Sequence, residues 1–259
     1  MRKLWVMGAA AMLVLAIAAV AIAQTAVTNT YTVDGATTPS KAGSKKKPVP
    51  IAIRFDYQVG EVENRRPTPV KKYNIKFGGT QVNTNVAGKC SQATIDNEGA
   101  AGCPASSKVG TGYIENETGQ TSKPEDKSVP CNAKVTVINV GNRKANIYVE
   151  GSPTATDPRE KCAIQLAAGI PANYVRSGND TSLIFTVPDS LLHPGTPNLS
   201  NAVKRVQSNI KKITKRVNGK VRGYYEAIGG CKNKKRLITV TFTPESGTAG
   251  TAQHAAKCS

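Results

Sequence analysis

The 259-residue sequence has few of the residues and motifs on which hydrolytic and metal-dependent enzymes rely. It holds two histidines: His193 follows a Leu-Leu pair and precedes a proline, and His254 lies in a polar C-terminal segment. The serine elbow G-x-S-x-G and the zinc motif H-E-x-x-H are both absent. These absences argue against Ser–His–Asp and zinc-peptidase chemistry. We expect a protein that is not an enzyme and that uses no catalytic residue, metal or cofactor.

Closely spaced cysteines are also absent, since no C-x-x-C occurs in the chain. The segment from Cys90 to Gly112, CSQATIDNEGAAGCPASSKVGTG, separates its two cysteines by twelve residues. A zinc site needs pairs roughly two to four residues apart, and a redox centre needs a similarly close pair. The glycines that follow lack the phosphate-loop pattern G-x-x-x-x-G-K-[ST]. We therefore interpret this segment as a loop closed by a disulfide.

A single long apolar run is present, Leu4–Ala23, and it follows Arg2 and Lys3. It ends in Ala-Ile-Ala, so the sequence predicts a secretory signal peptide over residues 1–23, cleaved after Ala23. An uncleaved anchor is the alternative, because the run is long enough to span ~30 Å of hydrocarbon. No second run approaches that length. We therefore expect a secreted or envelope-associated protein whose mature chain has no transmembrane span.

All the cysteines lie in the mature chain, residues 24–259. An even number of cysteines behind an export signal predicts a disulfide framework. Spacing alone leaves every pairing open. The six residues are Cys90, Cys103, Cys131, Cys162, Cys231 and Cys258.

Alternation of apolar and polar residues is the main structural signal. It is clearest in IAIRFDYQV, residues 51–59, and returns in KVTVINV, ANIYVEG, TSLIFTV and RLITVTFT. Such runs, separated by Gly, Pro, Asn and Asp, predict antiparallel strands with one buried face. We expect an all-β fold, a two-layer antiparallel β-sandwich formed by a single domain over residues 24–259.

Two features leave alternatives open. Apolar residues over 203–217 recur at helical spacing, but they are all β-branched and Asn218-Gly219 is a strong hairpin signal, so we favour strands. The proline-punctuated segment 188–203 is a possible boundary between two lobes.

Two segments resemble exported, β-rich proteins of actinobacteria. The first is YNIKFGGTQVNTNVAGKCSQATIDNEGAAGCPASSKVGTGYIEN, with its Cys-loop before a C-P-x-x-S-x-V-G-T-G run, and the second is GYYEAIGGCKNKKRLITVTFTPESGTAGTAQHAAKCS at the end. The resemblance implies a secreted β-sandwich with Cys90–Cys103 and Cys231–Cys258 paired, which leaves Cys131–Cys162. It implies no activity.

Basic residues outnumber acidic ones, 35 to 17, and they crowd the stretch from Lys204 to Arg236. Such a strip either blocks edge-to-edge aggregation of strands or attracts a polyanion. We expect it to bind an anionic wall polymer, glycan or lipid headgroup, with Tyr224 and Tyr225 beside it as possible stacking platforms. The oligomeric state stays open. The predicted polyanion-binding residues are Lys211, Lys212, Lys215, Arg216, Lys220, Arg222, Lys232, Lys234, Lys235 and Arg236.

Two other functions are compatible with the sequence. A glycan hydrolase could use a pair of carboxylates, and the candidate pairs are Glu61 with Glu63, Glu115 with Glu117, and Glu125 with Asp126. A sequence-blind binder of extracellular nucleic acid would need phosphate contacts alone. No base-reading motif is present, so we expect no specific nucleic acid partner.

Overall fold

The computed structural model describes residues 27–259, so the signal peptide predicted over residues 1–23 lies outside the described residues. The fold is all-β, as predicted, with antiparallel pairing throughout the named strands. The strands are β1 (Asn29–Thr38), β2 (Val49–Glu61), β3 (Val70–Phe77), β4 (Thr80–Val82), β5 (Lys108–Gln120), β6 (Val129–Pro130), β7 (Ala133–Gly141), β8 (Lys144–Gly151), β9 (Leu166–Ser177), β10 (Asp180–Thr186), β11 (Leu199–Ile210), β12 (Thr214–Val217), β13 (Lys220–Gly223), β14 (Tyr225–Ala227), β15 (Lys235–Pro244) and β16 (Gly250–Lys257).

Helices are few and short. They are α1 (Gln92–Glu98), α2 (Asp189–Leu192) and two 3-10 turns, Ala105–Ser107 and Pro158–Glu160. No helix in the described part of the chain is long and apolar enough to cross a membrane.

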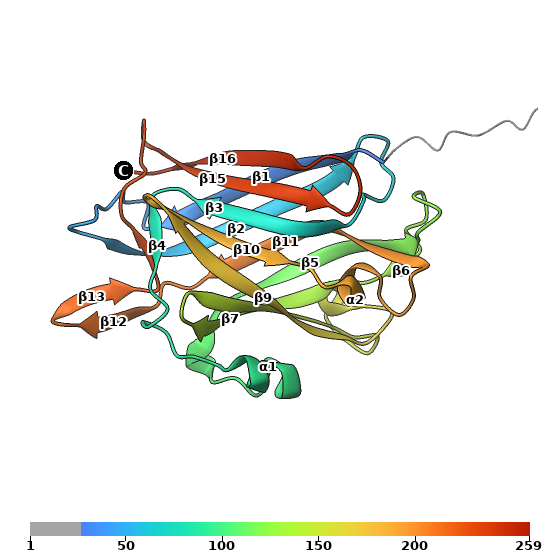
Figure 1. Cartoon of the computed structure of the whole chain (residues 1–259), viewed down its shortest axis with the longest axis horizontal. Coiled ribbons are helices and arrows are strands. Elements are labelled where there is room, and N and C mark those ends of the chain that lie inside the picture. Colours follow the sequence, from blue (N-terminus) through green and yellow to red (C-terminus); the bar gives the residue numbers. More distant parts are fainter. Residues whose placement is uncertain (1–26) are drawn as a thin grey trace, which may run out of the picture.

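Fourteen strands form one continuous antiparallel sheet rather than two separate ones. Hydrogen bonds connect them in the order β16-β15-β3-β10-β9-β8-β7-β5-β11-β2-β14-β4, with β1 on the other side of β2 and β6 beside β5. The sheet folds back on itself so that β1 comes to lie beside β16 (Figure 1). The predicted division into two layers is therefore not seen in the hydrogen bonding, because the fourteen strands form one continuous hydrogen-bonded sheet.

Side chains rather than backbone hydrogen bonds join β1 to the far end of the sheet. The ring of Tyr31 stacks on Phe242 of β15 with centroids 4.3 Å apart, and Asp34 Oδ1 lies 3.3 Å from His254 Nε2 on β16. Stacked rings contribute about 1 kcal/mol beyond their buried area. The join encloses a single main core.

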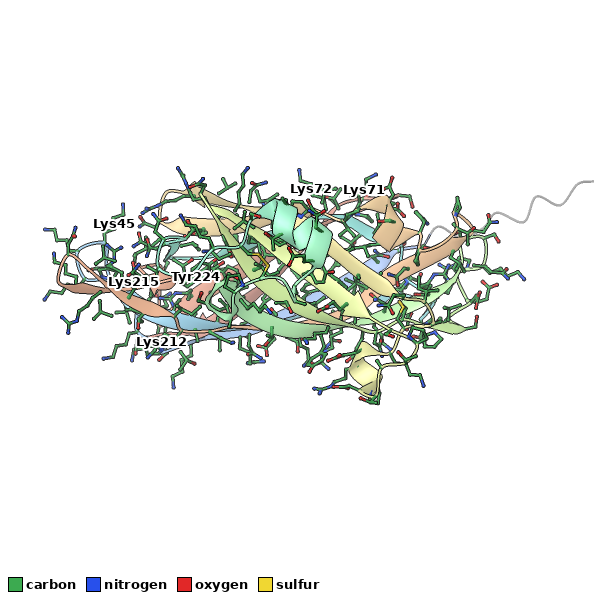
Figure 2. All side chains as sticks on the ribbon, turned by 90° about the horizontal axis from the view of Figure 1, so that it is seen from below. Lys45, Lys71, Lys72, Lys212, Lys215 and Tyr224 are labelled. Atoms are coloured by element: carbon green, nitrogen blue, oxygen red, sulfur yellow. A yellow bond between two sulfur atoms is a disulfide. The ribbon has the colours of Figure 1, made fainter. Side chains whose placement is uncertain are left out.

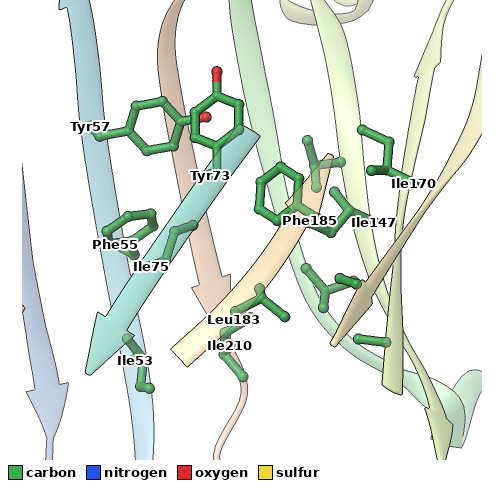
Figure 3. Close-up of a cluster of buried hydrophobic side chains, with 14 of the residues drawn as sticks. Ile53, Phe55, Tyr57, Tyr73, Ile75, Ile147, Ile170, Leu183, Phe185 and Ile210 are labelled. Atoms are coloured by element: carbon green, nitrogen blue, oxygen red, sulfur yellow. The ribbon is translucent and has the colours of Figure 1, made fainter. Parts of the chain in front are cut away.

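The inner face of β2 shows how the sequence pattern builds that core. Ile51, Ile53, Phe55, Tyr57 and Val59 are each at most 4 % exposed, as their alternation predicts. Aromatic rings gather on β2, β3, β10 and β15, whereas the facing strands supply mainly Val, Ile and Ala (Figure 3). The two halves of the core therefore differ in the size of their side chains.

Three disulfides are formed, Cys90–Cys103, Cys131–Cys162 and Cys231–Cys258, and the described chain has no free cysteine. These are the pairings that the resemblance implied. Cys90 and Cys103 flank α1 and pack with Ile95 against Tyr148, forming a small second core. Ser91 caps α1 by accepting a hydrogen bond from Thr94 N at 3.0 Å. The segment from Cys90 to Cys103 is therefore a loop closed by a disulfide, as interpreted from the sequence, and it contains α1.

The segment with helical spacing is extended, as we favoured. β11 lies between β5 and β2, and a bulge between Val203 and Arg205 accounts for the three-residue step from Val203 to Val206. The four-residue step from Val206 to Ile210 keeps both side chains on one face of a strand. After a break, β12 and β13 form a separate two-stranded hairpin. The segment 188–200 contains α2 and leads directly into this central strand.

Candidate polyanion-binding surface

Three segments far apart in the sequence meet at one end of the molecule, which we term the basic end: residues 41–47, 211–222 and 231–235. In Figure 1 they lie at the left, in the loop between β1 and β2, in the β12–β13 hairpin and at the start of β15. Backbone hydrogen bonds link two of them through the last two residues of the sequence, because Ala42 N donates to Ser259 O at 2.6 Å and Cys258 N donates to Lys234 O at 2.9 Å. The Cys231–Cys258 disulfide fixes the same junction.

The β12–β13 hairpin projects from the body at this end (Figure 1). Its turn is Asn218-Gly219, with φ of 50° and 74°, the left-handed values that a tight two-residue hairpin requires. Cross-strand register places Lys215 opposite Arg222 and Val217 opposite Lys220. Like charges directly opposite each other destabilise a hairpin in isolation, and the carboxylate of Glu226 offsets this effect at the Lys215–Arg222 position.

The exposed cations of the basic end form no ion pair with any carboxylate of residues 27–259. Glu226 is the sole acidic residue in the three segments and the stretch between the last two. Lys212 and Lys215 point outward from the hairpin, and Lys45 lies nearby at the same end (Figure 2). The exposed members of the set are Lys41, Lys45, Lys46, Lys47, Lys211, Lys212, Lys215, Arg216, Lys220, Lys232, Lys234 and Lys235.

Arg222 differs from these lysines because it is neutralised. Its Nε and Nη2 donate to the two carboxylate oxygens of Glu226 at 2.9 and 2.8 Å, a bidentate pair. Burial alone would raise the pKa of Glu226, but Arg222, Gly223 N–H and the Gln81 amide lower it to about 2. The predicted binding role of Arg222 is therefore reduced to holding the base of the hairpin.

Arg236 corrects the prediction outright. Its side chain is 0 % exposed, so it cannot meet a polymer in solution. Nη1 donates to Thr37 Oγ1 at 2.9 Å, and Nη2 lies 3.3 Å from the carbonyls of Lys41 and Ala42. Burial lowers the pKa of this guanidinium. Arg236 thus positions the 41–47 loop instead of contacting a ligand.

The tyrosines beside the strip are also internal. Tyr224 is 0 % and Tyr225 1 % exposed, and Tyr224 Oη donates to Tyr174 Oη at 3.2 Å. Their rings form edge-to-face pairs with Tyr174, and burial raises the pKa of both hydroxyls. The predicted stacking of these rings on sugars or bases is wrong, because both rings are buried in the core and cannot contact a ligand in solution. Figure 2 shows Tyr224 within the body.

The surface predicted from the sequence does not include the 41–47 loop, although Lys45, Lys46 and Lys47 stand together between a serine and a proline. A run of three lysines was the available signal. The sequence does not show that this loop lies beside the hairpin and the C-terminal strands in the folded protein.

The carboxylates proposed for a hydrolase lie away from the basic end and are engaged in local structure. Glu61 accepts hydrogen bonds from Glu63 N, Arg65 N and Arg65 Nη2, and Arg65 is the main reason that its pKa is lowered to about 2. Asp126 accepts from Gln120 N at 2.7 Å and Ser128 N at 3.0 Å, and its pKa is likewise lowered to about 2.

Two of the remaining candidate carboxylates, Glu63 and Glu117, form ion pairs. Glu117 lies between Lys127 Nζ at 3.1 Å and Lys204 Nζ at 3.4 Å, and Glu63 pairs with Arg65 at 3.2 Å. A glycosidase acid needs a raised pKa, which none of the shifted carboxyls described here has. Within residues 27–259, no group of three or more His, Cys, Asp or Glu side chains could hold a metal ion.

Comparison with known proteins adds no relative to this geometry. No protein-family model matches the sequence, and searches of curated proteins and of solved structures give no significant match. The resemblance to exported proteins of actinobacteria therefore stays a prediction. The function has to be argued from the site itself.

Proposed function

We propose that the protein is an exported, non-enzymatic module of the cell envelope whose basic end binds anionic polymers. The observation that carries the proposal is the exposed, unpaired set of lysines that three separate segments bring together. Lysine is a compact, hydrated point charge that suits loose contact with a repeating row of phosphates, sulfates or carboxylates.

The chemistry of the surface favours sequence-blind binding. With Tyr224 and Tyr225 buried, the basic end offers no exposed aromatic ring for stacking on bases or sugars. Its cations also lack the bidentate arginine forks that read base edges, apart from Arg216. Attraction is therefore spread over the polymer and depends on charge density, and it weakens as salt shortens the screening length to about 8 Å at physiological ionic strength.

The location of the charge supports a binding role over a purely protective one. Lysines that block aggregation work at sheet edges, and this account suits β12 and β13. The 41–47 loop is not an edge strand, yet it contributes four exposed lysines to the same end. Protection of sheet edges does not explain the lysines of this loop, whereas binding of an anionic ligand does.

The test is co-sedimentation of the oxidised mature protein with isolated cell envelopes, and with a soluble polyphosphate, over about 50 to 300 mM salt. We expect strong binding at low salt that is lost at moderate salt. The variant carrying Lys212→Glu and Lys215→Glu should bind at least about tenfold more weakly, since each lost phosphate contact removes released counterions.

The matched control carries Lys71→Glu and Lys72→Glu, two exposed lysines on β3 that lie away from the hairpin (Figure 2). The overall charge change is identical in the two variants. Equal binding losses would mean that net charge alone is responsible and would overturn the assignment to the basic end. No binding by the parent protein at low salt would overturn the proposal itself.

A further inference from the structure

The main core contains an internal cavity of about 110 Å³. Side chains from β2, β3, β5, β7, β8, β9, β10, β11 and α2 line it, and almost all are aliphatic or aromatic. Figure 3 shows part of this lining, with Phe55 and Tyr73 on one side and Ile147 and Ile170 on the other. The polymer-binding surface does not use this space, so it calls for a separate explanation.

A small residue faces the cavity on β11. Ser208 lines it and pairs with Phe55 of β2 on one side and with Gly112 of β5 on the other. Gly112 does not open the space, because a side chain there would collide with the backbone of Gln207 and Ser208. A serine among larger aliphatic and aromatic lining residues leaves a gap that well-packed interiors normally fill.

The shape of the space favours a chain over a compact ring. The lining follows β11 along its length, through Asn201, Val203, Val206, Ser208 and Ile210. A water needs ~10–15 Å³ by the same measure, so 110 Å³ holds about eight non-hydrogen atoms. A long lining with a small volume describes a narrow slot.

Two residues of the lining have a buried polar atom without a hydrogen-bond partner in the described part of the chain, Tyr73 at Oη and Asn116 at Oδ1. The tyrosine hydroxyl carries its own hydrogen, whereas the amide oxygen can only accept one. Asn116 Oδ1 is buried and accepts no hydrogen bond from residues 27–259, and this side chain lines the cavity. Its Nδ2 donates to Cys131 O at 2.6 Å, which fixes the amide orientation and leaves the carbonyl oxygen free. The neighbouring amide of Asn201 is fully occupied by Thr118 Oγ1 and Leu191 O. A buried acceptor without a donor costs about 1 to 3 kcal/mol, which a hydroxyl-bearing ligand would recover.

We infer that the cavity binds a slender aliphatic molecule carrying a single hydroxyl, with the alkyl chain along β11 and the hydroxyl donating to Asn116 Oδ1. Chemically, this is the class of medium-chain primary alcohols. The interior supplies the apolar contact area, and Asn116 sets which end of the chain lies beside β5.

The experiment titrates the disulfide-bonded mature protein with primary alcohols from butanol to dodecanol, and follows the methyl resonances of Ile147 and Leu183 by NMR. Affinity should rise about fourfold per methylene up to octanol and fall for longer chains. The methyls of Val62, an exposed residue outside the cavity, should not shift. An absence of shifts in the lining methyls, or an unbroken rise through dodecanol, would overturn the inference.

Two variants with one control locate the site. Ser208→Leu fills the slot and should weaken octanol binding at least tenfold, whereas Asn209→Leu places the same side chain at the adjacent exposed position and should not. Asn116→Leu should bind octanol no better than methyl heptyl ether, which is similar in length but has no donor. If either lining variant fails to fold, the comparison of octanol with the ether on the parent protein decides, and equal affinity contradicts the role of Asn116.

Discussion

A buried arginine stabilises a loop at each end of the molecule, but the surface around the two arginines differs in net charge. At the basic end, Arg236 is fully buried and its guanidinium lies against the carbonyls of residues 41, 42 and 229. At the other end, Arg66 is 3 % exposed and donates to the carbonyls of Gln120, Lys123 and Asp126. Each buried arginine thus fixes a loop through main-chain oxygens.

The surroundings of the two arginines differ in charge. Burial lowers the pKa of Arg66, but Asp126, Glu117 and Glu125 oppose that effect. Arg236 has no such carboxylate nearby, and burial alone acts on its pKa. Cations near Arg66, such as Lys127 and Arg65, are matched by acids, whereas the lysines near Arg236 are not. The excess positive charge is therefore found at the basic end because acidic residues are missing from it. Both ends have a loop held by a buried arginine.

The largest expected effect comes from opening one disulfide at each end. Replacing Cys231 and Cys258 by serine, or Cys131 and Cys162, should lower the free energy of unfolding by about 3.5 kcal/mol in either case, since the loops are of similar length. Urea unfolding measures this. In polymer-binding assays on folded protein, the first variant alone should bind more weakly. Equal binding losses would remove the distinction between the ends.

The buried arginines come next. Arg236→Met and Arg66→Met should each cost about 3 kcal/mol, because several buried carbonyls lose charged donors. Arg→Lys should restore little at either site, since one ammonium cannot replace the planar fork. Thermal or urea unfolding gives the comparison. Near-wild-type stability of Arg236→Met would show that a guanidinium without a carboxylate contributes nothing here.

Acid should act at both ends through one glutamate each. The pKa values of Glu226 and Glu61 are lowered from 4.5 to about 2 in the folded protein. Groups with depressed pKa values stabilise the fold above the unfolded pKa, so stability should fall as pH drops from about 4.5 towards 2. Glu226→Gln and Glu61→Gln should each flatten that decline in urea titrations over the same pH range. An unchanged slope in both variants would contradict these pKa shifts.

The smallest effect has opposite signs at the two ends. Neutralising Lys45 and Lys46 with glutamine should raise the free energy of unfolding by about 0.5 kcal/mol, since it relieves repulsion among unpaired cations. Replacing Lys127 and Lys204 by glutamine should lower it by a similar amount, because both pair with Glu117. Denaturant midpoints at low salt measure the difference, which high salt should abolish. A change of the same sign in the free energy of unfolding of both variants would contradict the difference in charge pairing between the two ends.

Local patterns in the sequence were sufficient for the strands. The alternation of residues 51–59 gave β2, and Asn218-Gly219 gave the β12–β13 turn, because both depend on near neighbours along the chain. The disulfide pairing came from resemblance, since spacing alone cannot choose among partners.

The charged site was harder to predict because its composition depends on contacts between distant segments. Arg236 is buried by a loop almost 200 residues earlier in the chain, and no pattern near residue 236 distinguishes it from the exposed lysines beside it. Lys45–Lys47 join the surface for the same reason. The Arg222–Glu226 pair, four residues apart across Gly223, was the one correction that local spacing might have suggested.

The contact between β1 and β16 has a consequence for self-association. Tyr31 against Phe242 and Asp34 against His254 turn two edge strands of the large sheet, β1 and β16, towards each other, so their unpaired backbone groups are shielded from a neighbouring molecule. Unprotected edges are the usual templates for intermolecular strand pairing. At high protein concentration these two edges therefore resist strand pairing between molecules, and a partner that binds at this place contacts side chains instead of adding a strand.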